Sequence, residues 1–138
     1  MQNVHPLFVH FPVALLLTAL ALEVVWWIAR RKWLREGATV TLTLGAVGAV
    51  AAVITGLTAA RAVGEADAAH VIVESHESFA IMATALAVAL AAVRLLKWDR
   101  GGMRWLFLAL LLATGVLLAW AAHLGGRLVY EFGVGTSF

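Results

Sequence analysis

The sequence predicts an all-α integral membrane protein, a four-helix bundle with both termini outside. Hydrophobic residues make up 63% of the 138 residues and charged residues only 13%, whereas roughly a quarter of an ordinary soluble domain is charged. Four long apolar runs follow one another, and most basic residues lie in two of the connections between them. A soluble fold of this size cannot bury so much apolar surface, so its solvent is a bilayer.

The apolar runs cover residues 11–29, 38–60, 78–96 and 105–122 of a single transmembrane domain, residues 1–138. A helix needs about 20 residues to cross the hydrocarbon core, and all four runs are of this order. Closed barrels also span bilayers, but their strands alternate between apolar and polar residues, and these runs do not. The short first and third connections predict antiparallel neighbours and an up-down bundle.

Two prolines limit where the first helix can begin. Proline is tolerated in the first turn of a helix and costly in its interior. We therefore expect this helix to begin near Phe11 or Pro12, with an interfacial segment from His5 to His10 before it.

Glu23 lies deep in the first run. A bare carboxylate is costly in hydrocarbon, so we expect Glu23 to face the bundle, to be protonated or to pair with a basic group. Arg94 or Lys97, near the end of the third run, is at a suitable depth. A proton-transfer role for Glu23 is the alternative, although no second deep carboxylate forms a relay with it.

Small residues recur every four positions in the second and third runs. These residues are Gly48, Ala52, Gly56 and Ala60 in one run and Ala83, Ala87 and Ala91 in the other. Such rows let helix backbones approach each other within lipid, and they also leave room for a flat cofactor. The third helix is expected to begin at His76, with Ser75 as its N-cap.

The glycine-rich stretch of residues 125–135 follows the fourth run. Glycines at this density predict turns and close backbone approach rather than more helix. We expect this tail to fold over the outer end of the bundle, near the histidines.

The basic residues predict the orientation in the membrane. Eight of the ten lie in or directly beside the first and third connections: Arg30, Arg31, Lys32, Arg35, Arg94, Lys97, Arg100 and Arg104. By the positive-inside rule these connections are cytoplasmic, as expected for a multi-pass protein of the bacterial cytoplasmic (inner) membrane. Tryptophans 26, 27, 33, 98 and 105 form an aromatic belt on the same side. Because topology explains the basic residues, nucleic-acid binding is not expected.

All five histidines map to the outer side: His5, His10, His70, His76 and His123. Imidazole is the natural ligand for haem iron, zinc and copper. We take His5, His10, His76 and His123 as candidate haem ligands, and His10, His76 and His123 as candidate metal ligands. The structural alternative is that they hydrogen-bond to headgroups, water or helix caps. The absence of cysteine excludes thiolate sites, iron–sulfur clusters and covalent haem attachment.

Several of these features together resemble a known family, the small bacterial membrane proteins of domain of unknown function 2231. They are the opening octapeptide from His5 to Pro12, Glu23, Gly56, His76 and the closing stretch from Gly125 to Val134. The resemblance covers nearly the whole chain and implies four spans, histidines near both ends and a redox setting. Thr58, Ala59 and Ala60 stand where the family has an acidic–aromatic pair. The family carries no assigned activity.

The leading hypothesis is a b-type haem-binding membrane protein in electron transfer at the periplasmic face. A quinone or a periplasmic cytochrome is then the expected partner, beside the lipid bilayer. One alternative is a non-haem zinc or copper protein. Another is an accessory subunit of a larger membrane complex, or a homo-oligomer, whose histidines serve only an interface. Enzymatic turnover by the isolated chain is not expected, because no nucleophile–base pair is apparent.

Overall fold

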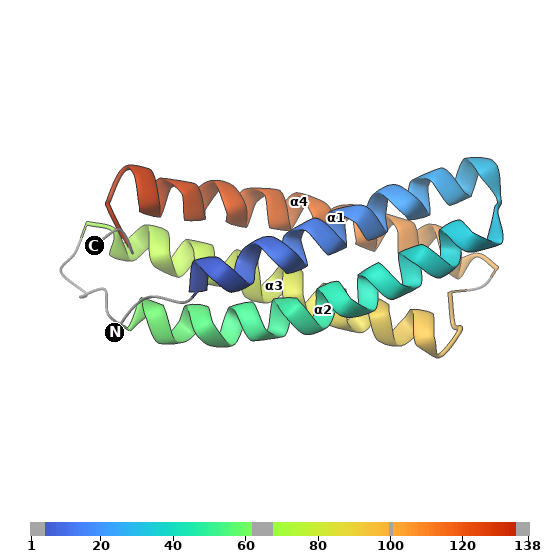
Figure 1. Cartoon of the computed structure of the whole chain (residues 1–138), viewed down its shortest axis with the longest axis horizontal. Helices are drawn as coiled ribbons and strands as arrows, with labels where there is room; N and C mark the ends of the chain where they lie inside the picture. Colours follow the sequence, from blue (N-terminus) through green and yellow to red (C-terminus); the bar gives the residue numbers. More distant parts are fainter. Residues whose placement is uncertain (1–4, 62–67, 100, 135–138) are drawn as a thin grey trace.

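The computed structural model describes residues 5–61, 68–99 and 101–134, and this part of the chain forms four long helices without a strand (Figure 1). They are α1 (His5–Ala29), α2 (Lys32–Ala60), α3 (His70–Leu95) and α4 (Met103–Tyr130). Each contains a segment long and apolar enough to cross a membrane. The predicted all-helical fold with four candidate membrane-spanning helices is confirmed.

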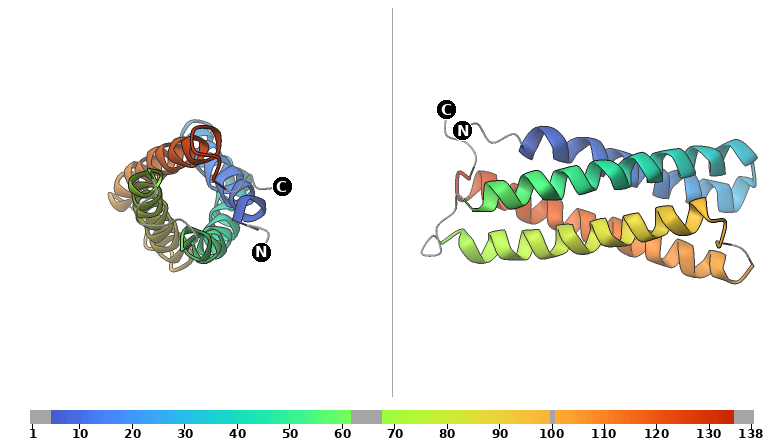
Figure 2. Two further views of the ribbon diagram at one scale, coloured as in Figure 1. Left: turned by 90° about the vertical axis from the view of Figure 1, so that its left-hand side faces the viewer. Right: turned by 90° about the horizontal axis from the view of Figure 1, so that it is seen from below.

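The helices form two antiparallel hairpins packed side by side (Figure 2). α1 packs mainly against α2 and α3 against α4, while α2 also contacts α3 and α1 contacts α4. α1 and α3 therefore lie diagonally across the bundle, as do α2 and α4. We call the end that carries His5 and His76 the histidine end, and the opposite end, with Arg35 and Arg94, the arginine end.

The core along the bundle axis is built from alanine and leucine. Ala19, Ala83 and Ala87 are completely buried, and Leu16 and Leu42 nearly so. The row of small residues predicted on the third helix therefore does pack inward. Because lipid gives no hydrophobic force between helices, this close approach gains dispersion contacts that hold the hairpins together.

The prediction that the first helix begins near Phe11 or Pro12 is wrong, because α1 begins at His5 and runs through Pro12. Pro12 is buried against Gly48 of α2, where a side-chain Cβ would lie 3.3 Å from the proline Cβ. Transmembrane helices tolerate such prolines because neighbouring groups satisfy the freed backbone. The helix therefore carries both His5 and His10.

The start of the third helix was also misplaced. α3 begins at His70 with Ala69 as its N-cap residue, so His76 lies in the second turn. Ser75 is not the cap, because its hydroxyl donates to the carbonyl of Val71 inside the helix at 2.9 Å. The apolar run marks only the part of a helix suited to hydrocarbon, and the helix itself extends beyond it.

The predicted turn at Gly125 and Gly126 is wrong in the same way, since α4 continues to Tyr130. The expected close approach does occur, because Gly125 lies against His76. Beyond the helix, Val134 packs on a small cluster of Ala69, Val73 and Leu128. The last described residues therefore do cover part of the histidine end.

Candidate functional site

His5 and His76 face each other at the histidine end. His5 opens α1 and His76 lies in α3, so the two rings meet across the diagonal of the bundle. Their centroids are 6.4 Å apart and their planes are inclined at 78°. Both side chains are partly buried. The imidazoles of two diagonally opposite helices thus lie next to each other between the hairpins.

Each ring is held by the second helix of its own hairpin. The Nδ1 of His76 lies 2.9 Å from the carbonyl oxygen of Ala121 in α4. The Nδ1 of His5 lies 3.2 Å from the hydroxyl oxygen of Thr55 in α2, and the backbone of Ala52 also hydrogen-bonds this ring. Because a carbonyl only accepts, neutral His76 carries its proton on Nδ1 and presents Nε2 as its electron-pair donor.

The protonation state of His5 is also that of a metal ligand. His5 precedes the candidate span that begins at Phe8. Burial, and secondarily the nearby His76, lowers the pKa of its imidazole, against a smaller opposing effect of the Ala52 backbone. A lowered pKa favours the neutral ring at neutral pH, and only the neutral ring can donate an electron pair.

Two glycines make room for the imidazoles. A Cβ on Gly56 of α2 would lie 3.0 Å from Cε1 of His5, and a Cβ on Gly125 of α4 would lie 3.2 Å from Cε1 of His76. Both distances are tighter than ordinary van der Waals contact. The helices of the second diagonal therefore present bare backbone to the ring pair.

The two hairpins repeat this arrangement. His76 follows His5 by 71 residues, and Arg94 follows Glu23 by the same 71. In each hairpin the histidine of the first helix hydrogen-bonds an alanine of the second. In both hairpins, this alanine lies four residues before the glycine that packs against the histidine ring. The bundle is thus an internal repeat, and His5 and His76 occupy equivalent positions.

We expect Gly125→Ala to lower the free energy of unfolding by about 1–3 kcal/mol, because the added methyl group presses on a ring anchored to Ala121. Gly126→Ala is the matched control, since nothing lies within 4 Å of a Cβ there. That substitution should instead stabilise the helix by about 0.5–1 kcal/mol. Denaturant titration of both variants in the same detergent makes the comparison. If Gly125→Ala stabilised the protein as much as Gly126→Ala, the claim that a Cβ at position 125 crowds His76 would be wrong.

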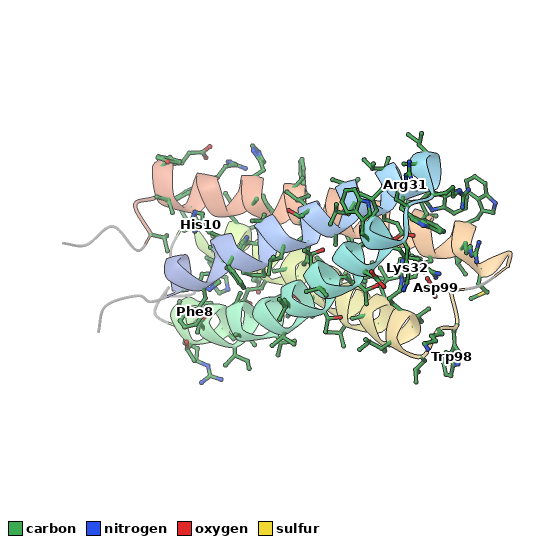
Figure 3. All side chains as sticks on the ribbon, turned by 45° about the vertical axis from the view of Figure 1, so that its right-hand side comes forward. Phe8, His10, Arg31, Lys32, Trp98 and Asp99 are labelled. Atoms are coloured by element: carbon green, nitrogen blue, oxygen red, sulfur yellow. The ribbon has the colours of Figure 1, made fainter. Side chains whose placement is uncertain are left out.

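The other histidines lie elsewhere. His10 is exposed near the histidine end (Figure 3), and His123 is exposed with its ring 5.5 Å from that of Trp120. His70 lies 3.5 Å from the carboxylate of Glu74. Within residues 5–61, 68–99 and 101–134, no three side chains of His, Cys, Asp or Glu are grouped to hold a metal ion. The described geometry therefore brings together His5 and His76.

A buried ion-pair network lies at the arginine end. The guanidinium of Arg94 donates to the carboxylate of Glu23 at 2.8 Å and lies 2.9 Å from that of Asp99. Arg35 donates to the same Asp99 oxygen at 2.6 Å. Arg94 and Lys97 were the basic groups predicted to reach Glu23, and the structure shows Glu23 paired with Arg94. Asp99 sits in the connection between α3 and α4, near Trp98 (Figure 3).

This network is deeply buried and balanced in charge. Glu23, Arg94 and Asp99 are 3%, 6% and 2% exposed. Arg94 also lies over the ring of Phe107, with 4.3 Å from its Cζ to the ring centroid. The two carboxylates and two guanidiniums join both hairpins, because Glu23 and Arg35 belong to one and Arg94 and Asp99 to the other. We infer that the network fixes the packing of the hairpins at this end.

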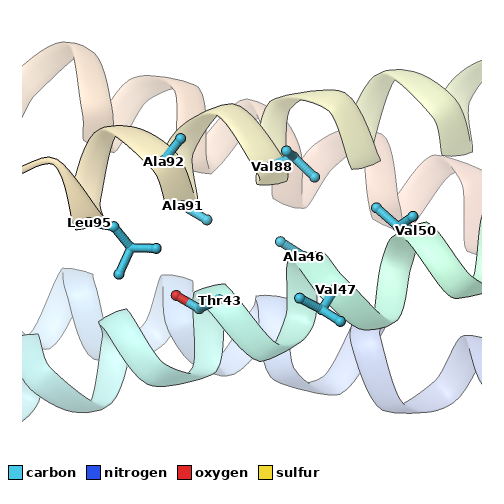
Figure 4. Close-up of a pocket in the computed structure, with 8 residues that line it drawn as sticks. All are labelled: Thr43, Ala46, Val47, Val50, Val88, Ala91, Ala92 and Leu95. Atoms are coloured by element: carbon cyan, nitrogen blue, oxygen red, sulfur yellow. The ribbon is translucent and has the colours of Figure 1, made fainter.

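Two apolar grooves open on the bundle surface. One, of about 340 Å³, lies between α2 and α3 (Figure 4) and is lined by Thr43, Ala46, Val47, Val50, Val88, Ala91, Ala92 and Leu95. The other, of about 460 Å³, is lined by residues of α3 and α4, among them Phe79 and Trp120. Neither is lined by His5 or His76. Their apolar walls suit acyl chains of a bilayer.

Sequence reasoning missed two parts of this arrangement. The predicted metal ligands included His10 but not His5, because the first helix was expected to begin near Phe11 or Pro12. Sequence reasoning also overlooked Asp99, whose position depends on a turn in which Lys97 has a φ of 60°. The offset of 71 residues shared by the two pairs is a signal in the sequence that could have identified His5 as the equivalent of His76.

Comparison with known proteins supports the membrane assignment. No curated protein matches the chain, and no solved structure matches it. A family model described as a predicted membrane protein, DUF2231, matches residues 1–137. The chain therefore belongs to the DUF2231 family of predicted membrane proteins.

Proposed function

We propose that this protein binds a b-type haem between His5 and His76 and transfers electrons at the histidine end. The observation that carries the proposal is the pairing of two equivalent imidazoles across the bundle diagonal. By the positive-inside rule this end faces the periplasm of a bacterial cytoplasmic membrane.

The separation of the rings favours one metal held between them. A metal-bound imidazole nitrogen lies about 2 Å from the metal, so two rings on opposite sides of one metal have centroids roughly 6 Å apart. The 6.4 Å between His5 and His76 is of this size. The carbonyl of Ala121, which fixes the tautomer of His76, is the kind of outer partner that orients histidine ligands.

The donor set favours haem over zinc. Zinc sites take three or four protein ligands, and within the described parts of the chain no third ligating side chain joins the pair. A porphyrin brings four nitrogens of its own and needs only axial ligands from the protein. Gly56 and Gly125, on the other diagonal, let the two imidazoles lie against bare backbone. Haem, when bound, supplies reversible one-electron exchange.

The residues of this chain then have distinct roles. His5 and His76 would hold the iron, and Ala121 and Thr55 would orient their rings. A site at the membrane surface suits two kinds of redox partner, a lipid-soluble quinone and a periplasmic cytochrome. His10 and His123 are exposed on the bundle, where such a partner can reach them.

The absorption spectrum of protein purified from haem-replete cells, oxidised and reduced, tests the proposal. We expect a Soret band, a reduced α-band and one haem per chain. Absence of a Soret band would overturn the proposal. Stoichiometric zinc or copper without pigment would instead make it a non-haem metal protein. Co-purification of large partners, with neither metal nor pigment, would make it an accessory subunit.

A further inference from the structure

The arginine end carries positive charge that its own carboxylates do not balance. Glu23 and Asp99 are paired with Arg94 and Arg35, and Lys32 is paired with Glu36 at 3.2 Å. Four other basic residues have no acidic partner among the described residues: Arg30, Arg31, Lys97 and Arg104. An anion from outside the chain is the natural counter-charge here.

Two of these residues converge on one aromatic cluster. The Cζ atoms of Arg30 and Arg104 lie 4.9 Å and 5.8 Å from the ring of Trp26, and Arg30 is also 4.8 Å from that of Trp27. Trp27 in turn packs on Trp105 of α4, with 4.2 Å between ring centroids. We call Arg30, Arg104, Trp26, Trp27 and Trp105 the arginine–tryptophan cluster. It joins the last turn of α1 to the first turn of α4.

The cluster has hydrogen-bond donors without acceptors. Within the described chain, the buried Nε1 of Trp27 and Nε of Arg104 have no partner. Buried donors are almost always satisfied in native proteins, by the protein itself or by a bound molecule. The adjacent start of α4 has no side-chain cap and no acidic residue in its first turn.

We propose that the arginine–tryptophan cluster binds the headgroup phosphate of an anionic phospholipid. Two guanidiniums recognise a phosphate by charge and by hydrogen bonds. A lipid, rather than free phosphate, suits the surroundings, because Ile28 is 82% exposed and Leu106 49% exposed on the same two helix ends. These apolar side chains would contact the acyl chains, while tryptophan rings lie at headgroup level.

Native mass spectrometry of the purified protein, titrated with phosphatidylglycerol in detergent, tests this site. Arg30→Gln and Arg104→Gln should each weaken phosphatidylglycerol binding about fivefold, and the double variant more than tenfold. Phosphatidylcholine should bind wild type and variants alike. Arg31→Gln is the matched control, because it removes the same charge from the same end without touching Trp26, and it should change binding less than twofold.

Three outcomes would overturn the proposal. Equal losses in Arg31→Gln and Arg30→Gln would indicate a diffuse surface potential and no site. Unchanged binding in the Arg30→Gln/Arg104→Gln variant, folded as judged by its circular dichroism, would place the lipid elsewhere. Displacement of the lipid by inorganic phosphate at equal concentration would make the ligand a free phosphate. The readout does not involve haem, so it is independent of the proposed function.

Discussion

Replacing His76 by alanine should lower the haem content of the purified protein at least tenfold, and His5→Ala should do the same. The two rings occupy equivalent positions in the two hairpins, so neither is expected to substitute for the other. Loss of one axial ligand leaves the haem held by a single imidazole and by packing. Haem per chain is measured by the pyridine haemochrome spectrum.

His10→Ala and His123→Ala are the matched controls, because both remove an imidazole that is exposed on the bundle. These variants should retain haem within about twofold of wild type. Greater haem loss in His10→Ala than in His5→Ala would mean that the ligand comes from the other face of α1. Circular dichroism of all four variants separates loss of ligand from loss of fold.

Arg94→Met should destabilise the bundle by about 3–5 kcal/mol, because it leaves the carboxylate of Glu23 buried in the bundle without its partner. Reversible unfolding in mixed micelles, measured at several denaturant concentrations, gives this free energy. Arg31→Met, at an exposed position of the same end, should change it by less than about 0.5 kcal/mol.

A double variant tests the cause of this loss. Glu23→Gln together with Arg94→Met removes the buried pair and leaves Asp99 with Arg35. Replacing a whole buried pair is often close to neutral, so the double variant should recover more than half of the loss. If it is as unstable as Arg94→Met alone, unpaired charge at Glu23 is not the cause.

Much of the fold follows from elementary properties of the sequence. The continuous apolar runs require helices, because lipid leaves no other way to satisfy the backbone. The cost of a carboxylate in hydrocarbon limited Glu23 to facing the bundle, being protonated or pairing with a basic group, and Arg94 was one of the two partners within reach. Both inferences rest on free-energy costs of several kcal/mol, one for unpaired backbone groups in lipid and one for a bare carboxylate there. The helix propensities of single residues are too small to overcome such costs.

The helix starts could not be predicted in the same way. The penalty for an interior proline is moderate in a transmembrane helix, and the fit of Pro12 against Gly48 offsets it. The wrong start of α1 also led to wrong expectations about the site, because the position of His5 depends on whether α1 includes it. Tertiary contacts between hairpins, such as the one between His5 and His76, depend on that same register.

The spin state of the oxidised haem tests the central claim most directly, because it reports both axial ligands at once. Electron paramagnetic resonance of the wild-type protein should give a low-spin signal typical of two imidazoles. In His5→Ala and His76→Ala any haem that remains should be high-spin. A protein without haem, a high-spin wild type, or a low-spin signal that survives both substitutions would contradict axial ligation by His5 and His76.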